Sequence, residues 1–166
     1  MPLLKTLARK KRLNYFIKPI PKYSHVLEVG CGTGWLGRYM AVNGWEHYTG
    51  IDLLPPADIV GNITQWQQLG LLPLSFDYII AFEVVEHANI FQSCYDLLKN
   101  EGRLLVTTPL PHMDWLLKLL ENMGLNQKRT SPHNHLIYLS KLELFTPVEL
   151  KKVGGMAQWA VLRKNI

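Results

Sequence analysis

Three glycines at alternating positions form the most informative pattern in this sequence. Gly30, Gly32 and Gly34 follow the apolar run Val26–Val29, which contains one acidic residue, Glu28. Glycine lets the backbone turn tightly and approach a ligand, and the N–H groups at the start of a following helix can face that ligand. The spacing therefore predicts a strand, a ligand-binding loop and a helix. The alternative is a glycine-rich turn that binds no ligand.

The run from Val26 to Gly34 resembles the first motif of the class I S-adenosylmethionine (SAM) dependent methyltransferases. In that family the glycine loop lies against the amino acid part of the cofactor. The segment Gly32–Gly37 also fits the dinucleotide fingerprint G-x-G-x-x-G, with Asp52 downstream, so an NAD-binding Rossmann protein is a more distant alternative. A pyrophosphate gains nothing from the acidic Glu28, whereas SAM carries an ammonium and a sulfonium. The acid therefore favours SAM over NAD.

The second and third predicted strands end in polar residues. Asp52 closes the second strand, at the sheet edge where ligands of open α/β proteins bind. The resemblance implies that Asp52 accepts the ribose hydroxyls, although it could instead be a turn or helix-capping residue. Asn62 would face the adenine amino group, and Ile63 would pack on the adenine ring. The resemblance implies this full set of cofactor-binding residues: Glu28, Gly30, Cys31, Gly32, Gly34, Asp52, Leu53, Asn62, Ile63, Phe82 and Glu83.

The segment Phe82–His87 resembles the fourth motif of the branch that includes ubiquinone-type O-methyltransferases. Glu83, Glu86 and His87 are spaced i, i+3 and i+4, so on a helix they would share one face. Two carboxylates and an imidazole are candidate ligands for a divalent metal, and a fourth could come from His133 or His135. A similar Glu-x-x-Glu-His arrangement binds metal in RNA 3′-terminal 2′-O-methyltransferases and some ubiquinone-type enzymes. The alternative is a helix start that contacts the cofactor without metal.

The chain after the predicted fifth strand offers several candidates for orienting an acceptor or taking its proton. They are His112, Trp115, His133, His135 and Tyr138, of which we take His135 as the candidate catalytic residue. Methyl transfer is an in-line displacement that depends mainly on holding two reactants together, so a dedicated base is optional.

The net charge of +5 is concentrated at the N-terminus. Residues 1–22 contain seven basic residues and no acid, whereas the rest contains 11 basic and 13 acidic residues. We expect a basic N-terminal arm over residues 1–22 and a SAM-dependent methyltransferase domain over residues 23–166. The spacing of the arm's leucines predicts a short amphipathic helix. The arm either contacts nucleic acid or an anionic membrane surface through residues 5–22, or packs across the mouth of the cofactor site.

Apolar runs and turn residues predict alternating strands and helices, followed by a hairpin. The strands are Val26–Val29, His47–Ile51, Asp58–Val60, Phe76–Phe82 and Arg103–Thr108, and the helices are Trp35–Asn43, Val85–Lys99 and Asp114–Met123. Gly154 and Gly155 suit a tight turn between the hairpin strands Val148–Val153 and Ala157–Arg163. This order is that of an α/β protein: a three-layer α/β/α sandwich with a Rossmann-like, seven-stranded, mostly parallel sheet and an antiparallel C-terminal hairpin.

Composition indicates a globular protein, with 48% hydrophobic and 19% charged residues among 166. The sequence contains no run of about 18 apolar residues that could span a membrane, and no secretory signal, so we expect a cytoplasmic location. We expect methyl transfer from SAM to a small-molecule or lipid-precursor acceptor. The alternatives are a nucleic-acid methyltransferase that uses the basic arm and a SAM-binding module without turnover. The oligomeric state stays open.

Overall fold

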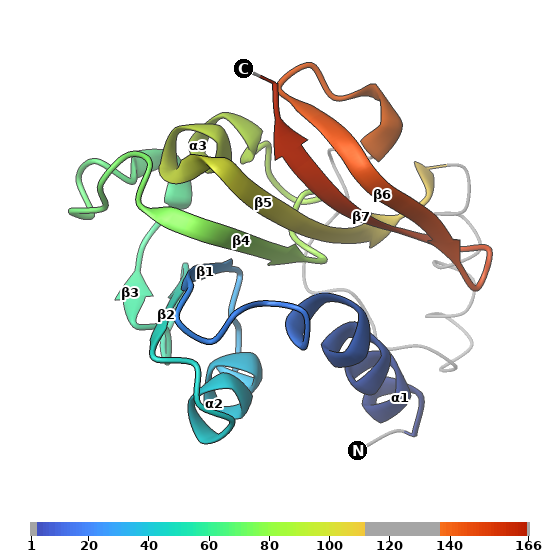
Figure 1. Ribbon diagram of the computed structural model, residues 1–166, viewed down its shortest axis with the longest axis horizontal. Coiled ribbons are helices and arrows are strands. Elements are labelled where there is room, and N and C mark those ends of the chain that lie inside the picture. The colour runs from blue at the N-terminus through green and yellow to red at the C-terminus, as the bar shows by residue number, and fades with distance from the viewer. Residues whose placement is uncertain (1–2, 112–136, 166) are drawn as a thin grey trace.

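The fold is built on one twisted sheet of seven strands (Figure 1). The computed structural model describes residues 3–111 and 137–165. The strands are β1 His25–Val29, β2 His47–Asp52, β3 Ile59–Val60, β4 Phe76–Phe82, β5 Leu98–Pro109, β6 Phe145–Val153 and β7 Ala157–Lys164. Their order is β3-β2-β1-β4-β5-β7-β6. The first five are parallel, and β7 is antiparallel to both β5 and β6, which confirms the predicted fold.

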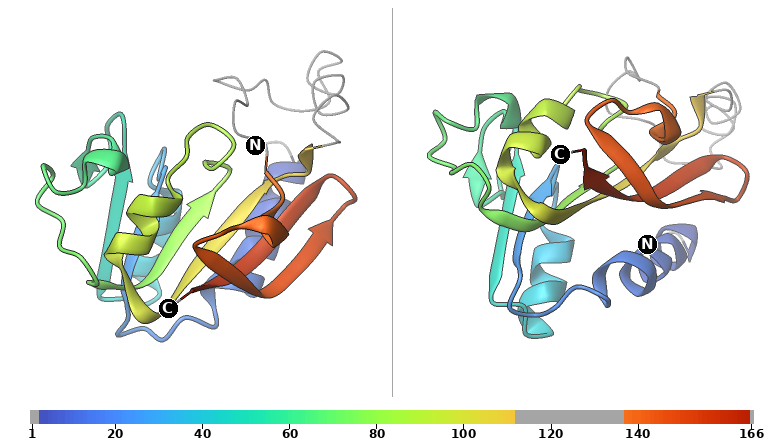
Figure 2. Two further views of the ribbon diagram at one scale, coloured as in Figure 1. Left: turned by 90° about the horizontal axis from the view of Figure 1, so that it is seen from above. Right: turned by 45° about the horizontal axis from the view of Figure 1, so that its top comes forward.

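Helical segments cover both faces of the sheet (Figure 1, Figure 2). One face carries α1 (Leu3–Arg12), the π-helical turn η1 (Leu13–Ile17) and α2 (Trp35–Val42). The opposite face carries α3 (Phe91–Leu97) and the 3₁₀ turns η2 (Ile63–Gln65) and η4 (Leu139–Lys141). Each face of the sheet therefore has its own hydrophobic core.

Alternation along the central strands divides the apolar side chains between these two cores. In β1, Leu27 and Val29 belong to the α3 side, whereas Val26 belongs to the α2 side. In β4, Ile79 faces α3 and Ile80 faces α2. A strand covered on both faces needs apolar residues at every position, which explains the uninterrupted apolar runs in the sequence.

The N-terminal segment packs against the sheet. Phe16 and Ile17 of η1 are 2% and 0% exposed, and Ile20 is also buried. The Phe16 ring lies 5.1 Å from the Phe82 ring and 5.3 Å from the Trp159 ring. These contacts hold the end of the basic segment beside the carboxyl end of β4, and they place α1 next to it.

The predicted helix Val85–Lys99 is wrong at both ends. α3 covers only Phe91–Leu97, and β5 begins at Leu98, so Gly102 lies inside a strand instead of ending a helix. The preceding residues form a turn, and Thr108 Oγ1 of β5 donates to the Glu86 carboxylate there at 2.9 Å. Local helical spacing did not anticipate this tertiary bond.

The other predicted elements are confirmed to within a few residues, the hairpin included. Gly154 and Gly155 at its turn have φ values of +59° and +69°. The predicted helix Asp114–Met123 lies outside the described residues. In the part of the chain that the structure describes, no helix is both long and apolar enough to cross a bilayer.

Candidate cofactor site

The glycine loop has left-handed backbone at all three predicted positions. Gly30, Gly32 and Gly34 have φ values of +74°, +52° and +67°, which L-residues with a side chain rarely adopt. A Cβ on Gly30 would collide with the Val84 side chain, whereas a Cβ on Gly32 would meet no atom within 4 Å. The loop is therefore packed on one side against the chain after β4 and open at Gly32, where a ligand has room.

Asp52 holds the glycine loop from the end of β2. Its Oδ2 accepts the Gly32 N–H at 2.8 Å, and its Oδ1 accepts the Leu54 N–H at 3.4 Å. The Gly30 N–H donates to the Ile51 carbonyl at 2.8 Å. The carboxyl ends of β1 and β2 are thus hydrogen-bonded to each other. Asp52 acts as a turn residue and also lies at the edge of the sheet where ligands bind.

Glu28 is a buried carboxyl beneath this loop. It is 3% exposed and accepts a hydrogen bond from the Tyr48 hydroxyl. Burial raises the pKa of Glu28 to about 7, and the nearby Asp52 carboxylate adds to the rise. Burial also raises the pKa of the Cys31 thiol to about 11, so this cysteine stays neutral and contributes backbone, not a thiolate, to the loop.

The carboxyl end of β4 carries a strained residue with two polar partners. Glu83 has a φ of +59°. Its carboxylate accepts a hydrogen bond from Thr107 Oγ1 at 2.8 Å and another from Arg12 Nη2 at 2.5 Å. The Arg12 guanidinium also lies 5.5 Å from the centre of the Phe82 ring. Non-glycine residues with positive φ are uncommon and cluster at functional sites. Glu83 is such a residue, and it contacts α1 through Arg12.

α1 also reaches the glycine loop. The guanidinium of Arg9 lies 4.6 Å from the centre of the Trp35 ring, at the first residue of α2. Arg9 and Arg12 therefore contact the first residue of α2 and the carboxyl end of β4. α1 thus lies beside the start of α2 and the end of β4.

These contacts join four segments at one edge of the sheet: the glycine loop, the end of β2, the end of β4 and α1. The sequence matches a family described as a methyltransferase domain over residues 4–162. The chain belongs to this family. It is a class I SAM-dependent methyltransferase domain, and membership excludes the alternative of an NAD-binding protein.

Curated relatives of this methyltransferase domain include ubiquinone biosynthesis O-methyltransferases. The protein of Xylella fastidiosa is 35% identical over 116 residues, covering 58% of this chain and 47% of the relative. That of Coxiella burnetii is 31% identical over 120 residues, covering 61% and 51%. The chain thus spans about half the length of the curated relatives it matches.

Solved structures share the fold at low sequence identity. A protein from Pyrococcus horikoshii superimposes with a TM-score of 0.69 at 19% identity, covering 97% of this chain and 92% of that one. A SAM-dependent methyltransferase from Anabaena variabilis gives 0.68 at 16% identity, covering 95% and 84%.

The predicted metal site lies partly outside the described residues, and its described members are Glu83, Glu86 and His87. Glu83, Glu86 and His87 lie in a turn, so the expected common helix face is wrong. Glu86 is 1% exposed, and burial, reinforced by the neighbouring Glu83 carboxylate, raises its pKa to about 7. Among residues 3–111 and 137–165, no three His, Cys, Asp or Glu side chains lie close enough together to hold a metal ion. His135 lies outside the described residues.

The remaining predicted cofactor residues occupy different environments. Leu53 is 67% exposed beside Asp52. Asn62 Oδ1 accepts the Thr64 N–H at 3.0 Å and caps η2, so its carbonyl already has one partner. Ile63 is buried in the α3-side core, which leaves little of its side chain to face a ligand.

Of the five candidates for orienting an acceptor, the structure describes one. Tyr138 is 40% exposed at the start of η4. The other four, the histidines His112, His133 and His135 together with Trp115, lie outside the described residues.

Sequence reasoning missed two residues of the site. Arg12 was one base among seven in the N-terminal segment, and nothing in its spacing pointed to Glu83, which lies 71 residues away. Tyr48 was read only as part of a strand. A signal for it existed: a Cβ on Gly37 would lie 2.5 Å from the Tyr48 ring, so the third glycine of the fingerprint-like run makes room for this side chain.

Proposed function

We propose that this domain transfers the methyl group of SAM to a small-molecule or lipid-precursor acceptor. The observation that carries the proposal is the meeting of an open, left-handed glycine loop with carboxylates from three parallel strand ends. SAM is cationic at its reactive end, so a site rich in carboxylates suits it better than it suits a pyrophosphate. The resemblance to ubiquinone biosynthesis O-methyltransferases supports the acceptor class.

Each charged residue has a role that fits a part of this cofactor. Asp52 would accept the ribose hydroxyls while it holds the glycine loop through Gly32. Glu28 and Glu83 would offset the positive charge of the methionine part. Arg12 has donors left after its bond to Glu83, and its Nε is buried without a partner among the described residues, so it would take the cofactor carboxylate.

Catalysis in such a site rests on position more than on proton transfer. When bound, SAM supplies an electrophilic methyl carbon on a positively charged sulfur. The residues of this chain hold the cofactor, exclude water through α1 and orient an acceptor for in-line attack. The methyl carbon leaves sulfur for the acceptor nucleophile, and the acceptor proton passes to solvent.

A nucleic-acid acceptor remains the second candidate because Lys10 and Lys11 of α1 are exposed. Arg9 and Arg12 of the same helix face the domain instead, which removes two cations from any outward basic surface. Deleting α1 would not separate the two functions, since it would remove both the exposed lysines and Arg12 of the cofactor site. The double variant Lys10→Ala/Lys11→Ala changes only the outward charges.

The test measures binding and transfer separately. Calorimetry should show binding of SAM and of its demethylated product, S-adenosylhomocysteine, and no binding of NAD. Labelled SAM should then methylate a fraction of a metabolite extract, with equal rates for the wild type and Lys10→Ala/Lys11→Ala. If the wild type labels RNA and the double variant does not, the nucleic-acid function is favoured. If the protein binds NAD and not SAM, both proposed functions are refuted.

A further inference from the structure

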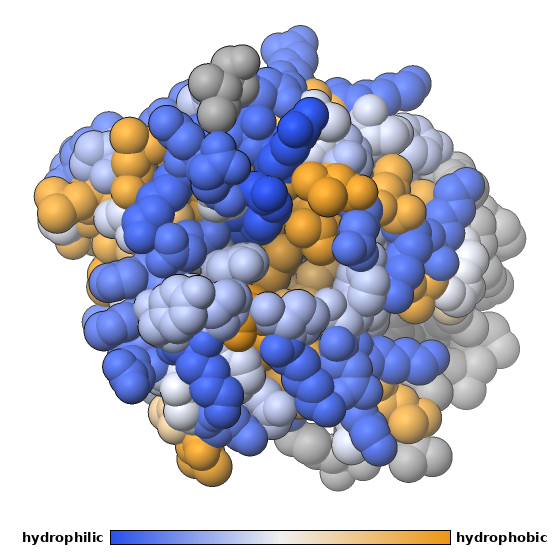
Figure 3. Space-filling model, viewed as in Figure 1, coloured by the Kyte–Doolittle hydropathy of each residue, from blue (hydrophilic) through white to orange (hydrophobic). Residues whose placement is uncertain are grey.

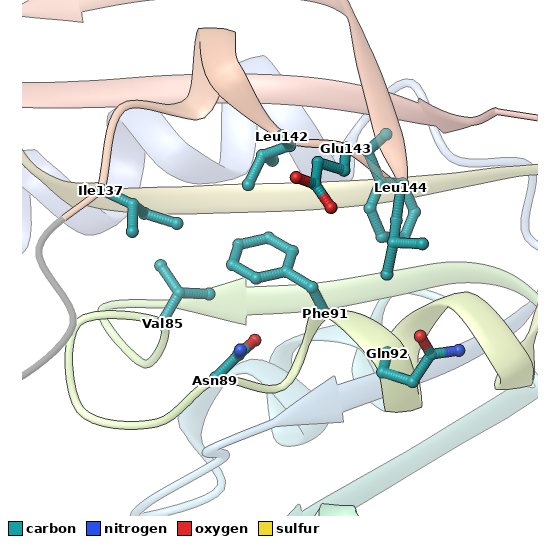
Figure 4. A pocket seen from close by; sticks show the side chains of 9 residues that line it. Val85, Asn89, Phe91, Gln92, Ile137, Leu142, Glu143 and Leu144 are labelled. Carbon is teal, nitrogen blue, oxygen red and sulfur yellow. The ribbon is translucent and has the colours of Figure 1, made fainter.

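A hollow lies on the α3 side of the sheet, between the start of α3 and the start of β6 (Figure 4). Figure 3 shows hydrophobic side chains among the hydrophilic ones on one face of the molecule. The volume is about 310 Å³, roughly twice that of an engineered apolar cavity that binds benzene. Six lining side chains are apolar: Val85, Phe91, Ile137, Leu142, Leu144 and Phe145.

The hollow adjoins the cofactor site through the turn after β4. Val84 packs against Gly30 of the glycine loop, where a Cβ would collide with it. The next residue, Val85, lines the hollow and is itself fully buried. Two consecutive residues, Val84 and Val85, thus lie between the glycine loop and the hollow.

The walls are fixed by packing and hydrogen bonds. The Phe145 ring lies 6.2 Å from the Phe91 ring and 5.9 Å from the Tyr95 ring. Asn165 Nδ2 donates to the Glu143 carbonyl at 2.7 Å, and the Asn165 N–H donates to the Leu144 carbonyl at 3.0 Å. The start of β6 is therefore held in place, and the hollow is preformed.

The polar lining residues set the charge that the hollow accepts. Asn89, Gln92 and Glu143 are the polar members, and no lysine or arginine is among the lining residues that the structure describes. In Figure 4 the Glu143 carboxylate points toward the Phe91 ring across the hollow. An anion here would meet the carboxylate of Glu143, an exposed residue whose repulsion solvent partly screens, whereas a neutral ring or chain with a hydroxyl would meet apolar walls and amide groups.

We propose that this hollow holds the apolar ring or short chain of a neutral acceptor, whose nucleophilic oxygen projects past Val85 toward the methyl donor. The inference rests on the proposed methyl transfer and names the acceptor class. In the transfer the bond from sulfur to the methyl carbon breaks, a bond from carbon to the acceptor oxygen forms, and the hydroxyl proton passes to solvent.

The test uses two probes of similar shape and different charge, 4-butylphenol and 4-butylbenzoate, with S-adenosylhomocysteine present. Calorimetry should show that the phenol binds about tenfold more tightly than the benzoate. Leu144→Trp, which fills the hollow, should weaken phenol binding about tenfold or more, whereas Val148→Trp, at an exposed position of β6, should not. Glu143→Gln should narrow the difference between the two probes.

Binding of S-adenosylhomocysteine to each variant shows that the variant has folded. Equal phenol affinity in Leu144→Trp and Val148→Trp would overturn the inference. So would a wild-type protein that binds S-adenosylhomocysteine and does not bind the phenol. If Leu144→Trp does not fold, Glu143→Gln decides alone: an unchanged preference for the phenol refutes the role of charge. A wild type that binds no S-adenosylhomocysteine refutes the proposed function itself.

Discussion

The buried carboxyl of Glu28 should make the stability of this domain depend on pH. Burial raises its pKa from 4.5 to about 7, so the folded protein binds this proton more tightly than the unfolded chain does. The free energy of unfolding that Glu28 contributes is therefore complete below about pH 4.5, falls as pH rises to about 7, and is constant above. At about 1.4 kcal/mol per pH unit, the loss amounts to about 3 kcal/mol.

Glu28→Gln tests this value because glutamine keeps an acceptor for the Tyr48 hydroxyl but cannot ionise. The variant should match the wild type near pH 4.5 and exceed its free energy of unfolding by about 3 kcal/mol at pH 8. Urea unfolding across this range measures both curves. Burial raises the pKa of Glu86 to about 7 as well, so the variant should retain part of the pH dependence. Glu46→Gln, at an exposed acid, is the matched control.

Parallel curves for the wild type and Glu28→Gln would refute the reasoning, since they would mean that Glu28 has the same pKa in the folded and unfolded states.

The ionisation of Glu28 should also affect cofactor binding. If its charge receives the positive end of SAM, the affinity for S-adenosylhomocysteine, which keeps the ammonium, should rise through pH 7 in the wild type and not in Glu28→Gln.

Three further predictions concern Asp52, the glycine loop and a strained leucine. Asp52→Ala should weaken S-adenosylhomocysteine binding by about 1.5–3 kcal/mol in calorimetry, the range for hydrogen bonds to a charged group, and unchanged affinity would leave Asp52 as a turn residue. Gly30→Ala should lower the melting temperature by colliding with its valine neighbour, whereas Gly32→Ala, facing open space, should stay nearer wild type in melting and lose cofactor affinity. Leu74→Gly should raise the free energy of unfolding by up to about 1 kcal/mol because φ is +52° there, whereas Leu72→Gly should lower it.

The sequence by itself determined the sheet and the glycine loop. β4 and the hairpin could be predicted because their signals are local: an apolar run for a strand covered on both faces, and paired glycines for a turn with positive φ. The signal for the loop from Gly30 to Gly34 is also local, since each glycine is required by the positive φ at its own position.

Only the tertiary structure decided the start of α3 and the partners of the charged residues. Local spacing favoured a helix from Val85, but the chain forms only a turn there, in which Glu86 bonds to Thr108 of β5. Arg12 meets Glu83 only because η1 is buried against the sheet. Spacing along the chain carries no information about such pairs, because burial and long-range contact, not neighbouring residues, set their position and their charge.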